Sequence, residues 1–234
     1  MNNRIAWLRE HYSDPLLTAL TVLVIVMLFV IAPLQASGLF LFQAFELAFA
    51  IVLVAGVFVM SGSRIAAFAM IASLVMATIG GIHRITAPSA LDINLFAGSW
   101  LIMSLTLGWA VAGVVFAPGR VTYHHVMGAV LLYLVIAVSF VPLLAFAGSL
   151  VPHSFSGITM QDNPALASNL IYFSFVTLTT TGYGDVFPVH PIARSLCNLE
   201  AVIGQLYPAT LLARLVTLLV SVMRECNRSL ELWI

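Results

Sequence analysis

Long apolar runs separated by short polar breaks dominate the sequence. A helix needs about 20 apolar residues to cross roughly 30 Å of hydrocarbon, and most of these runs approach or exceed that length. The breaks gather Pro, Gly, Ser and charged residues, as at 33–38 and 61–64. The pattern predicts six spanning helices: Leu16–Ala32, Leu39–Met60, Ile65–Ile82, Ile93–Phe116, His125–Ala147 and Ile192–Val222.

Composition agrees with a membrane protein. Of the 234 residues, 62% are hydrophobic and 8% are charged, whereas about a quarter of the residues are charged in a typical soluble domain. Nine basic and nine acidic residues cancel, and the basic residues form no cluster. A soluble globular enzyme and a nucleic-acid-binding protein are therefore excluded. Cys197 and Cys226 lie too far apart for a CxxC metal site and form no disulfide framework.

The arginines predict the orientation, because Lys and Arg are retained on the cytoplasmic side of a membrane. If the N-terminus is cytoplasmic, the outer segments carry only Arg84 and Arg194, and Arg214 lies within the last helix. The inner segments then carry Arg4, Arg9, Arg64, Arg120, Arg224 and Arg228. We therefore expect both termini in the cytoplasm.

The segment from Gly148 to Pro191 does not behave like a span. Its apolar run Leu170–Leu178 is about ten residues long, which suits a re-entrant helix, with Ser168 or Asn169 as its N-cap. Thr-Thr-Thr-Gly-Tyr-Gly-Asp follows at 179–185. Non-helical backbone at membrane depth is tolerated only where protein buries it or where it lines a water-filled cavity. This segment therefore indicates a path for something hydrophilic.

The stretch Thr180–Asp185 resembles the selectivity filter of potassium channels. Tyr172 and Phe173 occupy positions where that family places an aromatic cuff. The last helix carries Gly-Gln-Leu-Tyr at 204–207 and Ala-Arg-Leu-Val at 213–216, similar to the inner helix of two-span prokaryotic potassium pores. The resemblance covers about Tyr123–Met223, and the first four helices resemble those of six-span subunits only in number and place.

The resemblance implies an all-α membrane protein with a re-entrant pore helix and filter loop between its fifth and sixth spans. One chain supplies one filter strand, so a homotetramer is implied, with K⁺ ions as the only cofactor and no enzymatic activity. The K⁺ ligands would be the Thr180 hydroxyl and the backbone carbonyls of Thr180, Thr181, Gly182 and Tyr183, with Gly184 completing the filter.

The chemistry explains these residue types. A ring of carbonyl oxygens replaces the water around a cation without a full charge that would trap it. Carbonyls that all point to one axis require alternating backbone handedness, and Gly182 and Gly184 reach φ > 0 without steric cost. The pore helix aims its partly negative C-terminal end at the cation. We expect the Tyr183 ring to pack on Tyr172 or Phe173, away from the ion.

Other residues would support the filter or take part in gating. The expected supports are Asp185, Tyr172, Phe173 and Glu200, the last either bracing the pore helix or acting functionally as an intramembrane carboxyl. Two positions depart from the family: Thr181 stands where Val or Ile is usual, and Val176 stands where some relatives have Glu, which removes a carboxyl partner of Asp185. Gly204 and Pro208 form either a gating hinge or a static bend.

The chain is expected to consist of an N-terminal segment 1–14, a four-helix domain 15–119, a pore module 120–224 and a tail 225–234. The four-helix domain resembles a voltage sensor, but Ile93–Phe116 contains no arginine, so we expect no voltage sensing by an arginine ladder. A pore-only chain starting near Arg120 is expected to remain potassium-selective. Arg214 is expected to reach lipid headgroups, and Glu46 to pair with Arg84.

We therefore expect a multi-pass protein of the prokaryotic inner or plasma membrane, whose partners are the lipid bilayer and three further copies of itself. Whether a regulatory subunit also binds is left open, and no nucleic acid is expected as a partner. One alternative is a potassium transporter subunit, although such proteins usually keep a single Gly in each filter strand and carry four strands on one chain. A second is an intramembrane enzyme that uses His124 or His125, for which no Ser or Asp stands at suitable spacing.

Overall fold

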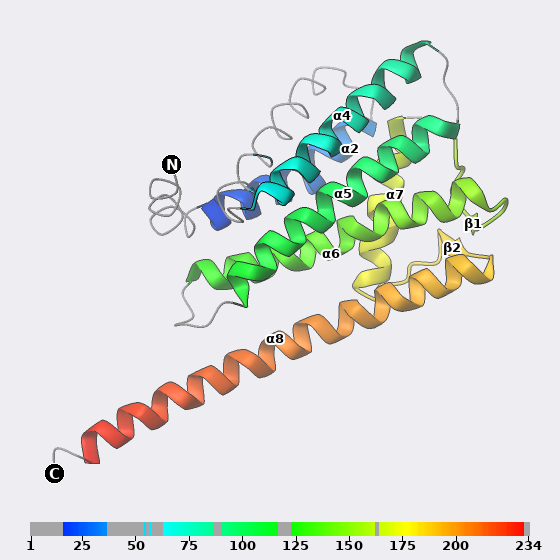
Figure 1. The fold of residues 1–234 in the computed structure, drawn as a ribbon. Helices are drawn as coiled ribbons and strands as arrows, with labels where there is room; N and C mark the ends of the chain where they lie inside the picture. The colour runs from blue at the N-terminus through cyan, green and yellow to red at the C-terminus, as the bar shows by residue number, and fades with distance from the viewer. Residues whose placement is uncertain are drawn as a thin grey trace.

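The computed structural model describes residues 16–36, 63–86, 90–116, 123–161 and 164–231, together with Val54 and Val57. Nearly all of these residues are helical (Figure 1). After a helix over residues 16–26, the elements are η1 Met27–Ile31, α2 Ala32–Ala36, α4 Arg64–Thr86, α5 Ala90–Val115, α6 Tyr123–Leu150, β1 Phe155–Ser156, α7 Pro164–Leu178, β2 Phe187–Pro188 and α8 Pro191–Glu231. Apart from Val54 and Val57, the predicted span Leu39–Met60 lies outside the described residues.

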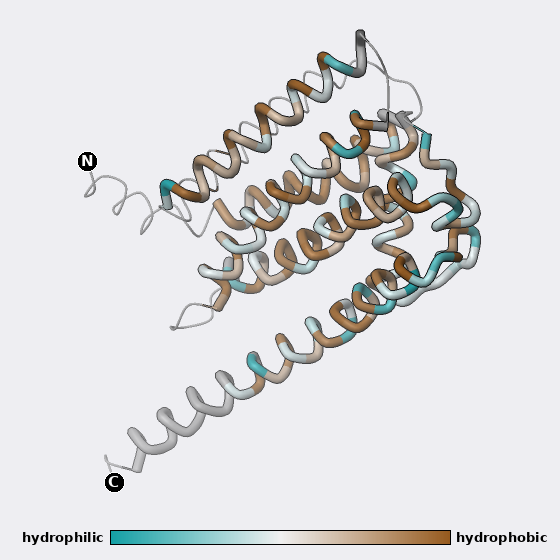
Figure 2. The backbone as a smooth tube through the Cα atoms, turned by 45° about the vertical axis from the view of Figure 1, so that its right-hand side comes forward, coloured by the Kyte–Doolittle hydropathy of each residue, from teal (hydrophilic) through white to brown (hydrophobic). Residues whose placement is uncertain are grey.

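Four helices in the described ranges are long and apolar enough to cross a membrane. They cover Leu16–Leu34, Arg64–His83, Leu91–Val115 and His125–Leu150. Figure 2 shows that hydrophobic residues dominate these helices, while hydrophilic ones gather near their ends and around the loops. At 41 residues α8 is also long enough to cross a membrane, and its charged residues include Arg194, Glu200 and Arg214. The chain is a multi-pass membrane protein.

The first helix changes its winding at one point, and a proline explains the change. Pro33 has no N–H to donate to the Phe29 carbonyl, and its ring crowds that carbonyl. The preceding residues Met27–Ile31 form a π-helical turn, in which the N–H of Ala32 donates to the carbonyl of Met27. The helix therefore passes Pro33 without ending.

Helices α4, α5 and α6 follow one another in the chain and lie side by side (Figure 1). Near the connection of α4 to α5, His83 Nδ1 lies 2.7 Å from Oδ1 of the buried Asp92. The Ser149 hydroxyl of α6 donates to Asn94 Oδ1 of α5 at 2.7 Å. The first helix joins the same core through the buried side chains of Leu17, Leu20 and Val24.

Two predicted boundaries are wrong. The short helix begins at Pro164, so Ser168 and Asn169 lie inside α7 and cannot cap it. Proline suits a first helical turn because no intrahelical partner is needed for its missing N–H. The last helix begins at Pro191 and continues past Val222 to Glu231, through most of the predicted tail.

Candidate functional site

Segment 179–185 follows α7 and is attached directly to the end of that helix. The N–H of Thr179 donates to the Phe175 carbonyl at 3.0 Å. The carbonyl of Val176 accepts from Thr181 at 2.9 Å and from Gly182 at 3.4 Å. These bonds occupy carbonyls that a helix C-terminus otherwise leaves unpaired, so the first half of the segment has a fixed position relative to α7.

The backbone handedness alternates along this segment. Thr180, Gly182 and Gly184 have φ angles of +55°, +58° and +81°, while Thr181 and Tyr183, which lie between them, do not have positive φ. The alternation predicted at the two glycines is therefore present, and it extends to Thr180. A positive φ is costly for a β-branched residue, and such strain is found mostly where function requires it.

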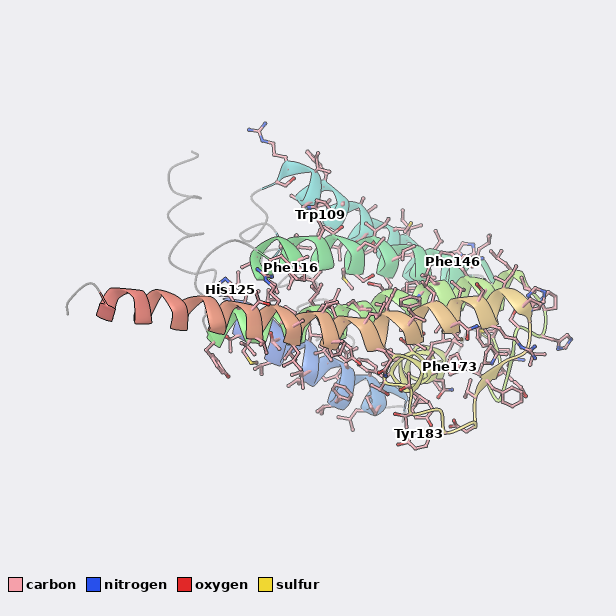
Figure 3. The ribbon with its side chains drawn as sticks, turned by 90° about the horizontal axis from the view of Figure 1, so that it is seen from below. Trp109, Phe116, His125, Phe146, Phe173 and Tyr183 are labelled. Atoms are coloured by element: carbon pink, nitrogen blue, oxygen red, sulfur yellow. The ribbon has the colours of Figure 1, made fainter. Side chains whose placement is uncertain are left out.

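Tyr172 of α7 contacts Tyr183 and Asp185 near the end of segment 179–185. The rings of Tyr183 and Tyr172 are stacked, with centroids 6.3 Å apart and planes 2° apart, and Figure 3 shows Tyr183 at the edge of the molecule. The Tyr172 hydroxyl donates to Asp185 Oδ2 at 2.8 Å. This hydrogen bond holds the pKa of Asp185 below its ordinary value. Phe173 instead is buried and meets the Phe155 ring edge-on, with centroids 5.6 Å apart.

A two-stranded sheet holds the outer end of the segment, which the sequence analysis missed. Strands β1 and β2 pair antiparallel, with Ser156 opposite Phe187. The N–H of Val189 donates to the Ser154 carbonyl at 2.8 Å. Gly157, with φ +85°, lies so close to the segment that a Cβ would stand 2.0 Å from the Asp185 carbonyl oxygen. A glycine in a polar loop was the only sequence signal for this contact.

Helix α8 meets the inner end of the segment at two adjacent residues. A Cβ on Gly204 would stand 1.9 Å from the Leu178 carbonyl oxygen at the end of α7. The Gln205 amide Nε2 donates to the Thr180 hydroxyl at 2.9 Å. The structure thus gives Gly204 a packing role, in addition to the hinge or static bend predicted for Gly204 and Pro208, and α8 continues through Pro208 as one helix (Figure 1). Sequence reasoning did not single out Gln205 as a contact of Thr180.

Glu200 lies fully buried behind α7. The Ser174 hydroxyl lies within hydrogen-bonding distance of Glu200 Oε1 and, at 2.8 Å, of the Ala137 carbonyl oxygen. A hydroxyl has one proton, so both contacts are hydrogen bonds only if the carboxyl of Glu200 supplies a second one. The geometry thus fits a neutral Glu200 that joins α6, α7 and α8.

The far half of α8 contacts two other helices. The Tyr207 hydroxyl donates to the Ala129 carbonyl in α6 at 2.8 Å. Arg214 Nη1 donates to the Val115 carbonyl at 3.0 Å, and its guanidinium lies 4.9 Å from the centroid of the Phe116 ring. These contacts attach Arg214 to the end of α5, and its expected reach to lipid headgroups stays a prediction. Its charge binds the end of α5, where the helix dipole is negative.

The other residues singled out from the sequence do not lie at this site or lie outside the described residues. The partner expected for Arg84 was Glu46, which lies outside the described residues. His125 lies near the start of α6, well apart from Tyr183 (Figure 3), and the side chain of His124 is not among those described. The structure therefore brings together Tyr172, Thr180–Asp185 and the Gly204–Gln205 turn of α8.

Residues 125–221 match the family described as Ion channel. The match begins in α6 and includes α7, the segment 179–185 and most of α8. No curated protein and no solved structure matches the chain. The ion-channel match supports a channel function and favours a channel over an enzyme. Domains of this kind typically assemble into oligomers in membranes.

Proposed function

We propose that this chain is one subunit of a homotetrameric channel that conducts K⁺ passively. The observation that carries the proposal is the alternating handedness at Thr180, Gly182 and Gly184, directly after the C-terminal end of α7. Alternation turns successive carbonyls of an extended strand toward one side. Four such strands around an axis would supply stacked rings of oxygens from residues 180–183.

The chemistry of these ligands suits a monovalent cation. Carbonyl dipoles can replace the hydration shell of K⁺, and they hold the ion weakly enough for it to leave. The partly negative end of α7 adds a favourable potential for a cation. Thr181 keeps its carbonyl as a ligand. Its hydroxyl lies 2.8 Å from the Thr179 hydroxyl, so the two side chains are neighbours. A transporter strand with a single Gly fits the two left-handed glycines less well.

The proposal includes gating that does not depend on an arginine ladder. Moving one charge through 100 mV supplies about 2.3 kcal/mol, and α5 contains no arginine or lysine. The arginine distribution further supports cytoplasmic termini, and the resemblance to two-span prokaryotic pores supports a location in a prokaryotic cell membrane.

The test is recording from the purified full-length protein in a planar bilayer with opposed K⁺ and Na⁺ gradients. The reversal potential should follow K⁺ and ignore Na⁺, and Gly182→Ala should abolish the current because Ala is strained at φ +58°. Gly113→Ala is the matched control, because nothing lies within 4 Å of a Cβ at that helical glycine. Equal K⁺ and Na⁺ permeability would overturn the proposed selectivity, and a steep conductance–voltage curve would overturn the gating class.

A further inference from the structure

We propose that Gln205 positions the Thr180 hydroxyl and thereby sets the affinity of the inner end of the filter for cations. The inference rests on the proposed function, because it assigns a residue of α8 to the innermost ion site of the same pore. It adds a side chain from outside the filter strand to the group that controls the bound ion.

The contact joins two parts of the chain that are 25 residues apart. Gln205 Nε2 lies 2.9 Å from Thr180 Oγ1, and both side chains are exposed in the single subunit. In the proposed pore this exposed side faces the central axis, below the filter. A polar group at this position therefore lies where a cation enters or leaves.

The backbone determines where Gln205 lies. Only a glycine allows α8 to approach the Leu178 carbonyl as closely as Gly204 does. Leu178 ends α7 two residues before Thr180, so the same close approach brings the residue after Gly204 beside Thr180. The hydrogen bond from Tyr207 to Ala129 holds the next part of the helix against α6.

The three consecutive threonines have different hydrogen-bonding roles. Thr179 donates its hydroxyl to the Phe175 carbonyl at 2.7 Å, and the hydroxyls of Thr179 and Thr181 lie 2.8 Å apart. The Thr180 hydroxyl bonds Gln205 instead. A hydroxyl oxygen has two lone pairs, so the Gln205 amide leaves one for a cation. An oxygen held in place beforehand loses less freedom when an ion binds, which raises affinity.

Barium is a suitable probe, because Ba²⁺ is close to K⁺ in size and its double charge makes it dwell on oxygen ligands. Applied to the cytoplasmic side of the full-length channel, it should block wild type. Gln205→Leu removes the amide at similar volume and should weaken the block roughly tenfold, the effect of losing about one hydrogen bond. Thr180→Ala should weaken the block as well, and the double variant should lose no more than the stronger single one.

Thr210→Val is the matched control. It removes a polar group from the exposed side of the same helix, where the Thr210 hydroxyl bonds only the Tyr207 carbonyl in the described chain, and the block should stay unchanged. All variants are compared as isolated tetramers. If Gln205→Leu does not assemble, Gln205→Met takes its place, because it keeps the length of the side chain without the amide.

The outcomes separate the two proposals. If wild type selects K⁺ but Gln205→Leu is blocked as strongly as wild type, the inference is wrong and the proposed function stands. Additive losses in the double variant would also overturn the inference, because Gln205 would then act without Thr180. A wild type that does not select K⁺ would overturn the proposed function, and the inference with it.

Discussion

Gly204 of α8 lies directly against the carbonyl of Leu178, the last residue of α7. A Cβ at Gly204 would stand 1.9 Å from that oxygen and 2.8 Å from the carbonyl carbon. Both atoms belong to the backbone, so no side-chain rotation can make room. The distance between α8 and the start of segment 179–185 therefore depends on the absence of a side chain at one position.

Gly204→Ala should separate α7 from α8. Overpacking of this kind costs about 1–3 kcal/mol, and here the displaced backbone is the one that bears Thr180. We expect a lower melting temperature in detergent and loss of K⁺ selectivity. Gly113→Ala on α5 should be neutral or gain about 0.5–1 kcal/mol in helix stability, since its Cβ would meet nothing within 4 Å. Equal melting temperatures for the two variants would contradict this account.

The first helix should contribute to the stability of α7. The rings of Phe29 and Phe175 have centroids 5.3 Å apart, and the Phe175 carbonyl binds the N–H of Thr179. Phe29→Ala should cost about 1 kcal/mol, the value of an aromatic pair, and should reduce K⁺ selectivity. Phe68→Ala, at a side chain 70% exposed on α4, is the control and should leave both unchanged.

This contact changes the prediction for the pore-only chain. From the sequence, a chain starting near Arg120 was expected to remain selective. With Phe29 against Phe175, we now expect that chain to form a less selective pore. Selectivity equal to that of the full-length protein would restore the earlier prediction.

The bond between Tyr172 and Asp185 should make the outer mouth resistant to acid. Because the bond lowers the pKa of Asp185, its contribution is fully present above the ordinary pKa of a carboxyl and is lost as the pH falls through the lowered value. Tyr172→Phe should return the pKa toward its ordinary value, so that current fails at a less acidic external pH. Asp185→Asn is the control, since it has no carboxyl to titrate. Identical pH profiles for wild type and Tyr172→Phe would refute the link.

Glu200→Gln should be tolerated, and Glu200→Ala should not. The amide is neutral, keeps the shape of the carboxyl and can donate to Ser174, whose hydroxyl then donates to the Ala137 carbonyl at 2.8 Å. Alanine leaves a cavity and removes the link between the three helices, which costs about 2–5 kcal/mol. Melting temperatures of the two variants provide the measurement. Equal damage from both substitutions would contradict a neutral Glu200 that donates to Ser174.

The sequence predicted those features that depend on neighbouring residues. The bounds of α4, α5 and α6 lie within a few residues of the predicted spans, because length and apolarity are local properties. The left-handed glycines could also be predicted, since Gly182 and Gly184 stand two apart in a recognisable motif. The start of α7 was missed because its first turn precedes the apolar run.

Contacts between distant parts of the chain could not be predicted in this way. Arg214 and Val115 are 99 residues apart, and an arginine near a helix end looks the same in sequence whether it binds lipid or a carbonyl. Gln205 likewise gives no local sign that it will contact Thr180. Gly204 drew attention as a flexible residue, whereas its lack of volume is what the packing requires.

The two ends of segment 179–185 are attached to different parts of the protein. The inner end is held by α7 and by Gln205 of α8, and the outer end by the loop that carries β1 and Gly157. Any displacement between these two anchors must be absorbed by the residues between them. Two of these, Gly182 and Gly184, are glycines that can rotate without a side-chain clash. One of them, Gly182, would also supply a carbonyl ligand in the proposed pore, so ion binding and the most compliant part of the link between the two anchors would coincide there.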